Sequence, residues 1–332
     1  MSVLITGATG FVGQALTRLL VEKSQTEIHA LVRSVEHGKH LLPAGIRLFQ
    51  GEIENRAAVA NAMKGCKTVY HLAALAGVWA KNPNLFYRVN VEGTRTVLDT
   101  ALRAGVRKVV VTSTAGVMGP SPYAGVSVNE STHPNPPLIS IYDQTKMQAE
   151  QVSFSYFQKG LDLVIVNPTR IYGPGVDRES NSVTKLLRKF SQGKWRIIPG
   201  DGSSIGNYVY IRDVARGHLL AMRHGKPGER YILGGENVSY RQLFELLRQV
   251  TGSSHRLFNV PLPPIIYFAK AESYLANITN RKPLLAPDYV KKLSLNWPMS
   301  SEKAMNEIGY TFIPLKEGLT KTYRWLLETD RK

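Results

Sequence analysis

The most constraining feature of this sequence is the segment GATGFVG at residues 7–13, which follows a short apolar run, Val3–Thr6. A helical pattern continues from Phe11 to Glu22, so the glycines lie at a turn between a strand and a helix. There Gly7 permits a tight turn, Gly10 lets the backbone approach a pyrophosphate, and Gly13 lets helix and strand pack closely. The free N–H groups of the helix N-terminus attract the same anion. The segment therefore predicts a dinucleotide-binding site.

Strand and helix patterns alternate through the first half of the chain. Nearly continuous apolar strands separated by helices are typical of a parallel sheet that is covered on both faces. We predict strands at residues 3–6, 28–33, 46–50, 67–73, 106–112 and 161–167, and helices at 11–22, 54–64, 84–104 and 140–158, with a loop rich in Pro, Ser and Gly at 115–137.

The pattern changes after residue 168. Helices are predicted at about 180–192, 240–251, 263–278, 300–308 and 315–328, with short strands near 207–211 and 230–233. The predicted fold is α/β: a Rossmann-type doubly wound parallel sheet with a smaller C-terminal mixed α/β lobe. We assign residues 1–168 to the nucleotide-binding core, to which elements return from about 205–235, and residues 169–332 mainly to a substrate-binding lobe.

Composition narrows the classes of partner. The chain has 42 Lys and Arg against 25 Asp and Glu, a net charge of +17, which favours anionic partners. These charges are scattered and no nucleic-acid-binding motif is present, so we expect no nucleic acid. The eight His residues show no metal-ligand spacing, so we expect no metal.

Location follows from the cysteine and from the apolar segments. A single cysteine, Cys66, allows no disulfide within the chain and fits a reducing, cytoplasmic compartment. No signal-peptide pattern precedes the first strand, and no run approaches the ~18 apolar residues of a membrane span. The apolar segment LFNVPLPPIIYFA, residues 257–269, is compatible with a weak contact with a membrane surface.

Position 33 bears on the choice of nucleotide. Enzymes that prefer NAD usually place an acidic residue at the end of the second strand, where it binds the ribose 2′-hydroxyl and would repel the 2′-phosphate of NADP. This chain has Arg33 there, a side chain that binds phosphate with two N–H groups. The sequence favours NADP(H), with NAD(H) as the alternative.

Two further segments offer groups for proton transfer. The fifth predicted strand ends in TSTAGVMG, residues 112–119, and the carboxyl end of a parallel strand is where α/β sheets place reacting groups. A hydroxyl of Ser113 or Thr114 could donate a hydrogen bond to a substrate carbonyl. Tyr142 and Lys146 follow four residues apart on one helix face. Such pairs are common, so this spacing alone identifies nothing.

Together, a GxxGxxG turn, a Ser/Thr at the end of strand five and a YxxxK helix resemble the short-chain dehydrogenase/reductase superfamily. The chain looks like its extended (atypical) branch, the NAD-dependent epimerase/dehydratase superfamily, and is similar in look to dihydroflavonol 4-reductase and 3β-hydroxysteroid dehydrogenase-like reductases. The resemblance covers nearly the whole chain, with further landmarks at HLAAL (71–75), NVEGT (90–94), YDQTK (142–146), NPTRIYGPG (167–175), YVYIRDVARGHLLA (208–221) and WPMSSEKAMNEIGY (297–310).

The resemblance implies specific roles. Tyr142 would be the general acid, Lys146 would lower the pKa of Tyr142 and bind the nicotinamide ribose, and Thr114 would be the catalytic hydroxyl, with Ser113 as the fallback. Asn90 would lie near the cofactor, or else serve helix packing. The implied cofactor-binding residues are Gly7, Thr9, Gly10, Phe11, Val12, Arg33, Glu52, Ile53, Leu72, Ala73, Ala74, Asn90, Thr112, Tyr142, Lys146, Pro168, Thr169 and Ile171.

Two substrate classes of the family can be argued against from single positions in the sequence. Sugar-nucleotide relatives commonly have an arginine before an aromatic-rich strand, where it binds the pyrophosphate of the substrate, and this chain has Gly206 there. Dehydratases have an acidic pair after the catalytic Thr, and this chain has Ala115-Gly116. We therefore expect an NADPH-dependent reductase of a fairly apolar ketone or aldehyde. The candidate substrate contacts are Val78, Trp79, Met118, Tyr123, Tyr172 and Tyr208.

Two alternatives remain open at this stage. One is an NAD-dependent nucleotide-sugar epimerase, and the other is a regulator that binds NADP without turnover. Retention of both Tyr142 and Lys146 argues against the regulator. The resemblance also implies a homodimer formed through the helices at about 84–104 and 140–158.

Overall fold

The computed structural model describes residues 2–330 apart from 24, 25, 78, 124, 135–137, 177, 178, 280, 282 and 284–286. In this part of the chain the central element is a parallel seven-stranded sheet with the order β10-β6-β5-β4-β1-β2-β3. The order reverses at β1 and β4, and it is beside such a reversal that doubly wound sheets bind nucleotides. The strands are β1 (Ser2–Thr6), β2 (Glu27–Val32), β3 (Arg47–Gln50), β4 (Cys66–His71), β5 (Lys108–Thr112), β6 (Leu163–Pro168) and β10 (Arg230–Leu233).

The central strands form because their residues suit burial on both faces. Every residue of β6 is buried, as are Val109, Val110 and Val111 in β5. The β-branched side chains pack well on a pleated surface, and burial of each stabilises the fold by about 1.5–3 kcal/mol. Continuous burial of this kind is what distinguishes a covered parallel sheet from one with a solvated face.

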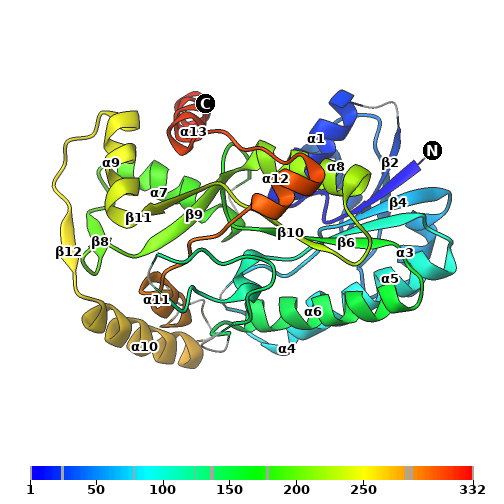
Figure 1. Cartoon of the computed structure of the whole chain (residues 1–332), viewed down its shortest axis with the longest axis horizontal. Coiled ribbons are helices and arrows are strands. Elements are labelled where there is room, and N and C mark those ends of the chain that lie inside the picture. The colour runs from blue at the N-terminus through cyan, green and yellow to red at the C-terminus, as the bar shows by residue number, and fades with distance from the viewer. Residues whose placement is uncertain are drawn as a thin grey trace.

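Helices cover both faces of the sheet (Figure 1). On one face lie α1 (Phe11–Lys23), α8 (Ile211–His224) and α12 (Glu302–Ile308), and on the other lie α3 (Arg56–Met63), α5 (Gly93–Arg103) and α6 (Ile141–Gln158). Shorter helices are α2 (Val35–Leu41), which follows β2, and α4 (Asn84–Tyr87), which precedes α5. The predicted Rossmann-type doubly wound core is confirmed.

A second group of elements continues beyond the carboxyl end of the sheet (Figure 1). It contains a three-stranded sheet, β11-β9-β7, and a two-stranded sheet, β12-β8. Its strands are β7 (Arg170–Tyr172), β8 (Ile197–Pro199), β9 (Ile205–Tyr210), β11 (Glu236–Ser239) and β12 (Phe258–Val260), and its helices are α7 (Ser182–Ser191), α9 (Tyr240–Thr251), α10 (Leu262–Ile278), α11 (Pro287–Leu293) and α13 (Leu315–Thr329). We call this group the substrate lobe, in keeping with its expected role.

The structure differs from the sequence prediction in several elements. The sequence prediction missed the helix α8, which begins where we predicted the end of a strand, and it also missed α2 and α11. The predicted helix at 84–104 is divided into α4, a π-helical turn at Arg88–Glu92 and α5. The segment 297–310, which we compared with the end of the substrate lobe, instead places α12 and Tyr310 against the core sheet. These contacts are long-range, so local patterns do not report them.

Candidate active site

The glycine turn has the geometry that a bound pyrophosphate requires. Gly7 has φ +73°, and a Cβ on it would lie 2.6 Å from the backbone nitrogen of Ala73 in the loop after β4. A Cβ on Gly13 would overlap the Gly7 carbonyl oxygen, so α1 packs directly against the turn. The turn and the N-terminus of α1 thus lie at the carboxyl end of β1, and so closely packed a glycine turn fits a dinucleotide.

A substitution at Gly7 tests this cradle. Gly7→Ala is expected to weaken nucleotide binding at least about tenfold, because the added methyl group pushes the turn away from Ala73. Gly105→Ala is the matched control, since Gly105 also has a positive φ, +64°, but a Cβ there meets nothing within 4 Å. Equal losses of nucleotide affinity in the two variants, measured by fluorescence titration, would show that backbone strain and not the cradle is responsible.

The other proposed nucleotide residues lie along the same edge of the sheet. Arg33 directly follows β2 and its side chain is exposed, and Glu52, which follows β3, is also exposed. Leu72, Ala73 and Ala74 follow β4 and are partly buried, as is Ile171, while Pro168 ends β6. Thr9 and Val12 are partly buried in the turn and in α1, and Phe11 is buried.

Three of the proposed nucleotide-binding residues use their side chains for contacts within the protein. The Ile53 side chain is buried against Gly93 of α5. The Thr112 hydroxyl shares a 2.9 Å hydrogen bond with His218 Nε2, and the Thr169 hydroxyl donates to Asn207 Oδ1 at 2.7 Å. The side chains of these three residues therefore serve the scaffold, and only their backbone groups remain for a nucleotide.

Asn90 also has a structural role. It is fully buried, its amide donates to the Thr145 hydroxyl at 3.0 Å and to the Leu75 carbonyl at 3.2 Å, and its oxygen accepts from Leu75 N–H at 2.7 Å. Thr145 in turn donates to the carbonyl of Tyr142 at 3.0 Å. Of the two interpretations of Asn90, the contacts support helix packing: it ties the loop after β4 to the first turn of α6.

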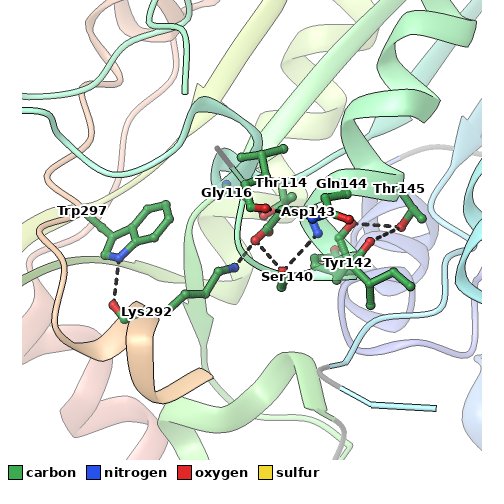
Figure 2. Close-up of polar contacts among 11 residues, drawn as sticks. Thr114, Gly116, Ser140, Tyr142, Asp143, Gln144, Thr145, Lys292 and Trp297 are labelled. Carbon is green, nitrogen blue, oxygen red and sulfur yellow. Dashed lines mark hydrogen bonds and ion pairs between the residues drawn. The ribbon is translucent and has the colours of Figure 1, made fainter. Parts of the chain in front are cut away.

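Of the proposed catalytic residues, Thr114 follows β5 and Tyr142 lies at the start of α6 (Figure 2). Thr114 caps a short 3₁₀ helix, and its Oγ1 accepts from Gly116 N–H at 3.2 Å. Lys146 is 2 % exposed, and its Nζ donates to the Thr112 carbonyl at 2.6 Å. Among the described residues, the buried hydroxyl of Ser113 has no hydrogen-bond partner. Lys146 of α6 therefore lies against the carboxyl end of β5, the strand that Ser113 and Thr114 follow.

The electrostatics of Tyr142 differ from the expectation. Burial raises the pKa of the tyrosine well above its ordinary value, and the negative charge of Asp143 raises it further. Burial lowers the pKa of Lys146 to about 8, and the attraction of Glu150 opposes that shift. The expected lowering of the Tyr142 pKa is therefore wrong for this structure, because desolvation of the phenol and the charge of Asp143 both raise that pKa.

Asp143 is a residue of this site that the sequence did not indicate. Its carboxylate is 2 % exposed, accepts from Ser140 Oγ at 2.6 Å, and forms an ion pair with Lys292 of α11 (Figure 2). It also fills the space that a side chain at Gly116 would need, beside Thr114. No acidic residue follows Thr114 in the sequence, but folding places the carboxylate of Asp143 beside Thr114. This carboxylate is already paired with Lys292.

Lys292 of α11, in the substrate lobe, contacts Asp143 of α6. Its backbone carbonyl accepts from the Trp297 indole N–H at 3.0 Å, and its Nζ lies 5.5 Å from the centre of the Trp297 ring. The side chain is 21 % exposed, so the pair with Asp143 is only partly open to water. Residues 143 and 292 are far apart in sequence, and no local pattern could have linked them.

The candidate substrate residues have different surroundings. Trp79 is half-buried, Tyr123 is 71 % exposed, and Val78 lies outside the described residues. Met118 is fully buried in a cluster with Trp297 and Met299, and Tyr172 is fully buried with its hydroxyl donating to the Leu315 carbonyl at 3.3 Å. Met118 and Tyr172 are core residues, which corrects their assignment as substrate contacts, because a fully buried side chain already has its contacts filled.

The structure also corrects the argument drawn from Gly206. A Cβ on Gly206 would collide with the guanidinium of Arg170, which therefore lies against this position. The Arg170 Nη1 donates to the hydroxyls of Tyr208 and Tyr240 at 3.2 and 3.1 Å. An arginine thus occupies the place that the sequence left without one, and it comes from β7 instead of β9.

The described residues contain neither a membrane-spanning helix nor a cluster of metal ligands. No helix in that part of the chain is long and apolar enough to cross a membrane. In the same residues, no group of three or more His, Cys, Asp or Glu side chains is arranged to hold a metal ion.

The chain is similar to known proteins over most of its length. The model of the NAD dependent epimerase/dehydratase family matches residues 3–234. A provisionally named dihydroflavonol 4-reductase from Synechocystis sp. is 33 % identical over 325 residues, covering 97 % of this chain and 93 % of that protein. The 3β-hydroxysteroid-dehydrogenase/decarboxylase isoform 1 of Arabidopsis thaliana is 26 % identical, with 96 % and 78 % covered.

A solved structure extends the comparison to a sugar-nucleotide enzyme. The UDP-glucose 4-epimerase of Thermotoga maritima, solved with UDP-glucose, superposes with a TM-score of 0.81 and 25 % identity. The superposition covers 99 % of each chain. The whole fold, and not only the nucleotide-binding core, is therefore similar to that of this family.

Proposed function

Since the chain belongs to the NAD dependent epimerase/dehydratase family, the extended branch of the short-chain dehydrogenase/reductases, we propose that it uses NADPH to reduce a ketone or aldehyde to an alcohol. It is an NAD(P)-dependent oxidoreductase by family. The observation that supports the proposal is the contact of Lys146 Nζ with the Thr112 carbonyl, which brings the helix that carries Tyr142 to the end of β5, where Thr114 lies.

The chemistry follows from the protonation states in the site. A bound nicotinamide nucleotide would supply a hydride for the carbonyl carbon, so the protein would have to provide a proton for the carbonyl oxygen. The raised pKa of Tyr142 keeps its phenol protonated, which suits a general acid in the reductive direction. The Thr114 hydroxyl accepts from Gly116 N–H, so its own proton can be donated to the substrate oxygen. Lys146 would hold the nicotinamide ribose.

The substrate is proposed to be a fairly apolar small molecule. Two similar proteins support this class by their names, one a dihydroflavonol reductase and the other a hydroxysteroid dehydrogenase/decarboxylase. Trp79 and Tyr123 remain candidates for contact with it, because their side chains are at least partly exposed. Tyr208 is 2 % exposed and its hydroxyl accepts from Arg170, so it is a core residue like Tyr172 and is not kept as a substrate contact.

Arg33 tests the proposed preference for NADPH. Replacing it by Ala is expected to weaken NADPH binding about ten- to a hundredfold, because an exposed guanidinium that can hold the 2′-phosphate is lost. NADH has no such phosphate, so its affinity should not change. The measurement is the Kd of both nucleotides for the wild type and the variant, and a parallel loss of NADH affinity would contradict the assignment.

A nucleotide-sugar epimerase remains the second candidate, and Arg170 is the observation that favours it. Its guanidinium lies at Gly206 and could face a pyrophosphate from that place. The similarity to a UDP-glucose 4-epimerase is also compatible with this activity. No observation favours the third hypothesis, a regulator that binds NADP without turnover, because Tyr142 and Lys146 are both present in the chain.

One experiment separates these functions. Purified protein is assayed for NADPH oxidation with a panel of apolar ketones and aldehydes, and separately for interconversion of UDP-sugars with NAD. Oxidation of NADPH by at least one carbonyl compound, without turnover of sugar nucleotides, is expected. Turnover of a UDP-sugar by protein that retains NAD through purification would replace the reductase proposal with the epimerase.

A further inference from the structure

The helix α10 exposes a row of large apolar side chains. Tyr267, Phe268, Tyr274, Leu275 and Ile278 are 71, 57, 69, 51 and 64 % exposed. They lie at spacings of three, four and seven residues, so they share one face of the helix. The helix is at the edge of the substrate lobe, beside α11 (Figure 1).

The opposite face of α10 carries small or charged residues instead. The residues it buries include Ala269, Glu272 and Ala276. A surface helix of a water-soluble protein normally turns its large apolar side chains toward the core and its polar ones toward water. The reversed arrangement in α10 indicates that its outer face is covered by an apolar partner.

The charges around α10 indicate which partner that is. Residues 256–292 contain six Lys and Arg against two Asp and Glu, of which Lys292 is paired with Asp143 and Lys282 lies outside the described residues. One of the acids, Glu272, is 6 % exposed and pairs with Arg281 at 3.1 Å. Lys270 is exposed on the helix, with its Nζ 5.9 Å from the centre of the Tyr267 ring. The apolar face is therefore bordered by positive charge, which calls for an anionic partner.

A second copy of the chain fits this surface less well. A two-fold contact would bring α10 against α10, with the same positive border facing itself on both sides. The net charge of +17 on each chain adds to that repulsion. A membrane that contains acidic lipid, by contrast, offers acyl chains to the apolar row and negative headgroups to the basic residues.

We propose that α10 docks this protein on the surface of a membrane that contains anionic lipid. The helix lies in the interface plane, with Tyr267, Phe268 and Leu275 among the acyl chains and the stems of Lys270 and Arg281 extending toward the headgroups. The aromatic rings suit the boundary between acyl chains and water. The docking surface belongs to the substrate lobe, and it does not depend on which reaction the site performs.

Sedimentation with vesicles tests the proposal. The probe is phosphatidylcholine vesicles with and without about a third phosphatidylglycerol. The wild type is expected to bind the acidic vesicles at least about tenfold more tightly than the neutral ones. The double variant Phe268→Ser/Leu275→Ser is expected to lose at least about tenfold of the affinity for acidic vesicles. Leu327→Ser is the matched control, because Leu327 is 42 % exposed on α13.

Three outcomes would overturn the proposal. The first is a wild type that does not bind acidic vesicles. The second is an equal loss of binding in the Leu327→Ser control. The third is a wild-type dimer, seen by light scattering without lipid, that the double variant turns into a monomer, because a second copy would then cover α10. Circular dichroism and NADPH titration of each variant show that fold and nucleotide site are intact.

Discussion

Replacing Tyr142 by Phe is expected to lower carbonyl reduction about a thousandfold while NADPH binding is retained, because the change removes a single hydroxyl that donates the proton. The backbone of Tyr142 is held on the first turn of α6, because Thr145 donates to its carbonyl and Asn90 donates to Thr145, so the variant should keep the fold of the site. The measurement is kcat together with the Kd of NADPH for both proteins.

Tyr156→Phe is the matched control for this prediction. Tyr156 lies on the same helix, is 4 % exposed, and packs in the core beside Val152 and Leu161. Removal of its hydroxyl should leave kcat unchanged within about twofold. If Tyr142→Phe retained the activity of the wild type, another group would have to supply the proton, and the assignment of the general acid would be wrong.

The pH profile provides a further test of the same site. Reduction needs protonated Tyr142, whose raised pKa keeps it protonated beyond the usual range of tyrosine. Lys146, with its pKa lowered to about 8, loses its charge as the pH rises through that value. The rate of reduction is therefore expected to be level below pH 8 and to fall above it, through loss of the lysine charge and not of the phenol proton.

Replacing Lys292 by Met is expected to destabilise the fold by about 3 kcal/mol, because it leaves the buried carboxylate of Asp143 without its cation. It should also lower kcat, since an unpaired negative charge beside Tyr142 raises the pKa of the phenol further and makes it a weaker acid. Urea unfolding and steady-state kinetics measure the two effects.

The double variant Lys292→Met/Asp143→Asn separates charge from packing. It removes both members of the pair, so most of the lost stability and activity should return. Lys291→Met, one residue away and exposed on the same helix, should leave stability and kcat unchanged. Failure of the double variant to recover either quantity would mean that the lysine acts through its contacts with Trp297 and not through Asp143.

The Rossmann-type core was predictable because its signals are local. The strand–turn–helix context of GATGFVG and the apolar runs of β5 and β6 depend on neighbouring residues, and the structure has these elements in place. The helix α8 was not predicted because it begins directly after β9, without a break in the apolar pattern of YVYIRDVARG. The π-helical turn at Arg88–Glu92 was not predicted because the helical periodicity of the sequence continues through it.

The site was predictable only in part. The spacing of Tyr142 and Lys146 and the position of Thr114 could be taken from sequence, but the direction of the tyrosine pKa could not. That direction depends on how deeply the phenol is buried and on the charge of Asp143, which are properties of packing. Met118 and Tyr172 were assigned to the pocket because sequence order does not reveal which aromatic or apolar side chains the core has already enclosed.

The sequence by itself determined the family and the doubly wound sheet, because the motifs and apolar runs that indicate them consist of residues close together in the chain. Only the tertiary structure decided that Arg170 lies at Gly206, that Lys292 pairs with Asp143, and that α10 turns its apolar face outward. The physical reason is that charges and hydrophobic surfaces act over a few ångströms in space, and folding brings together groups that the sequence keeps far apart.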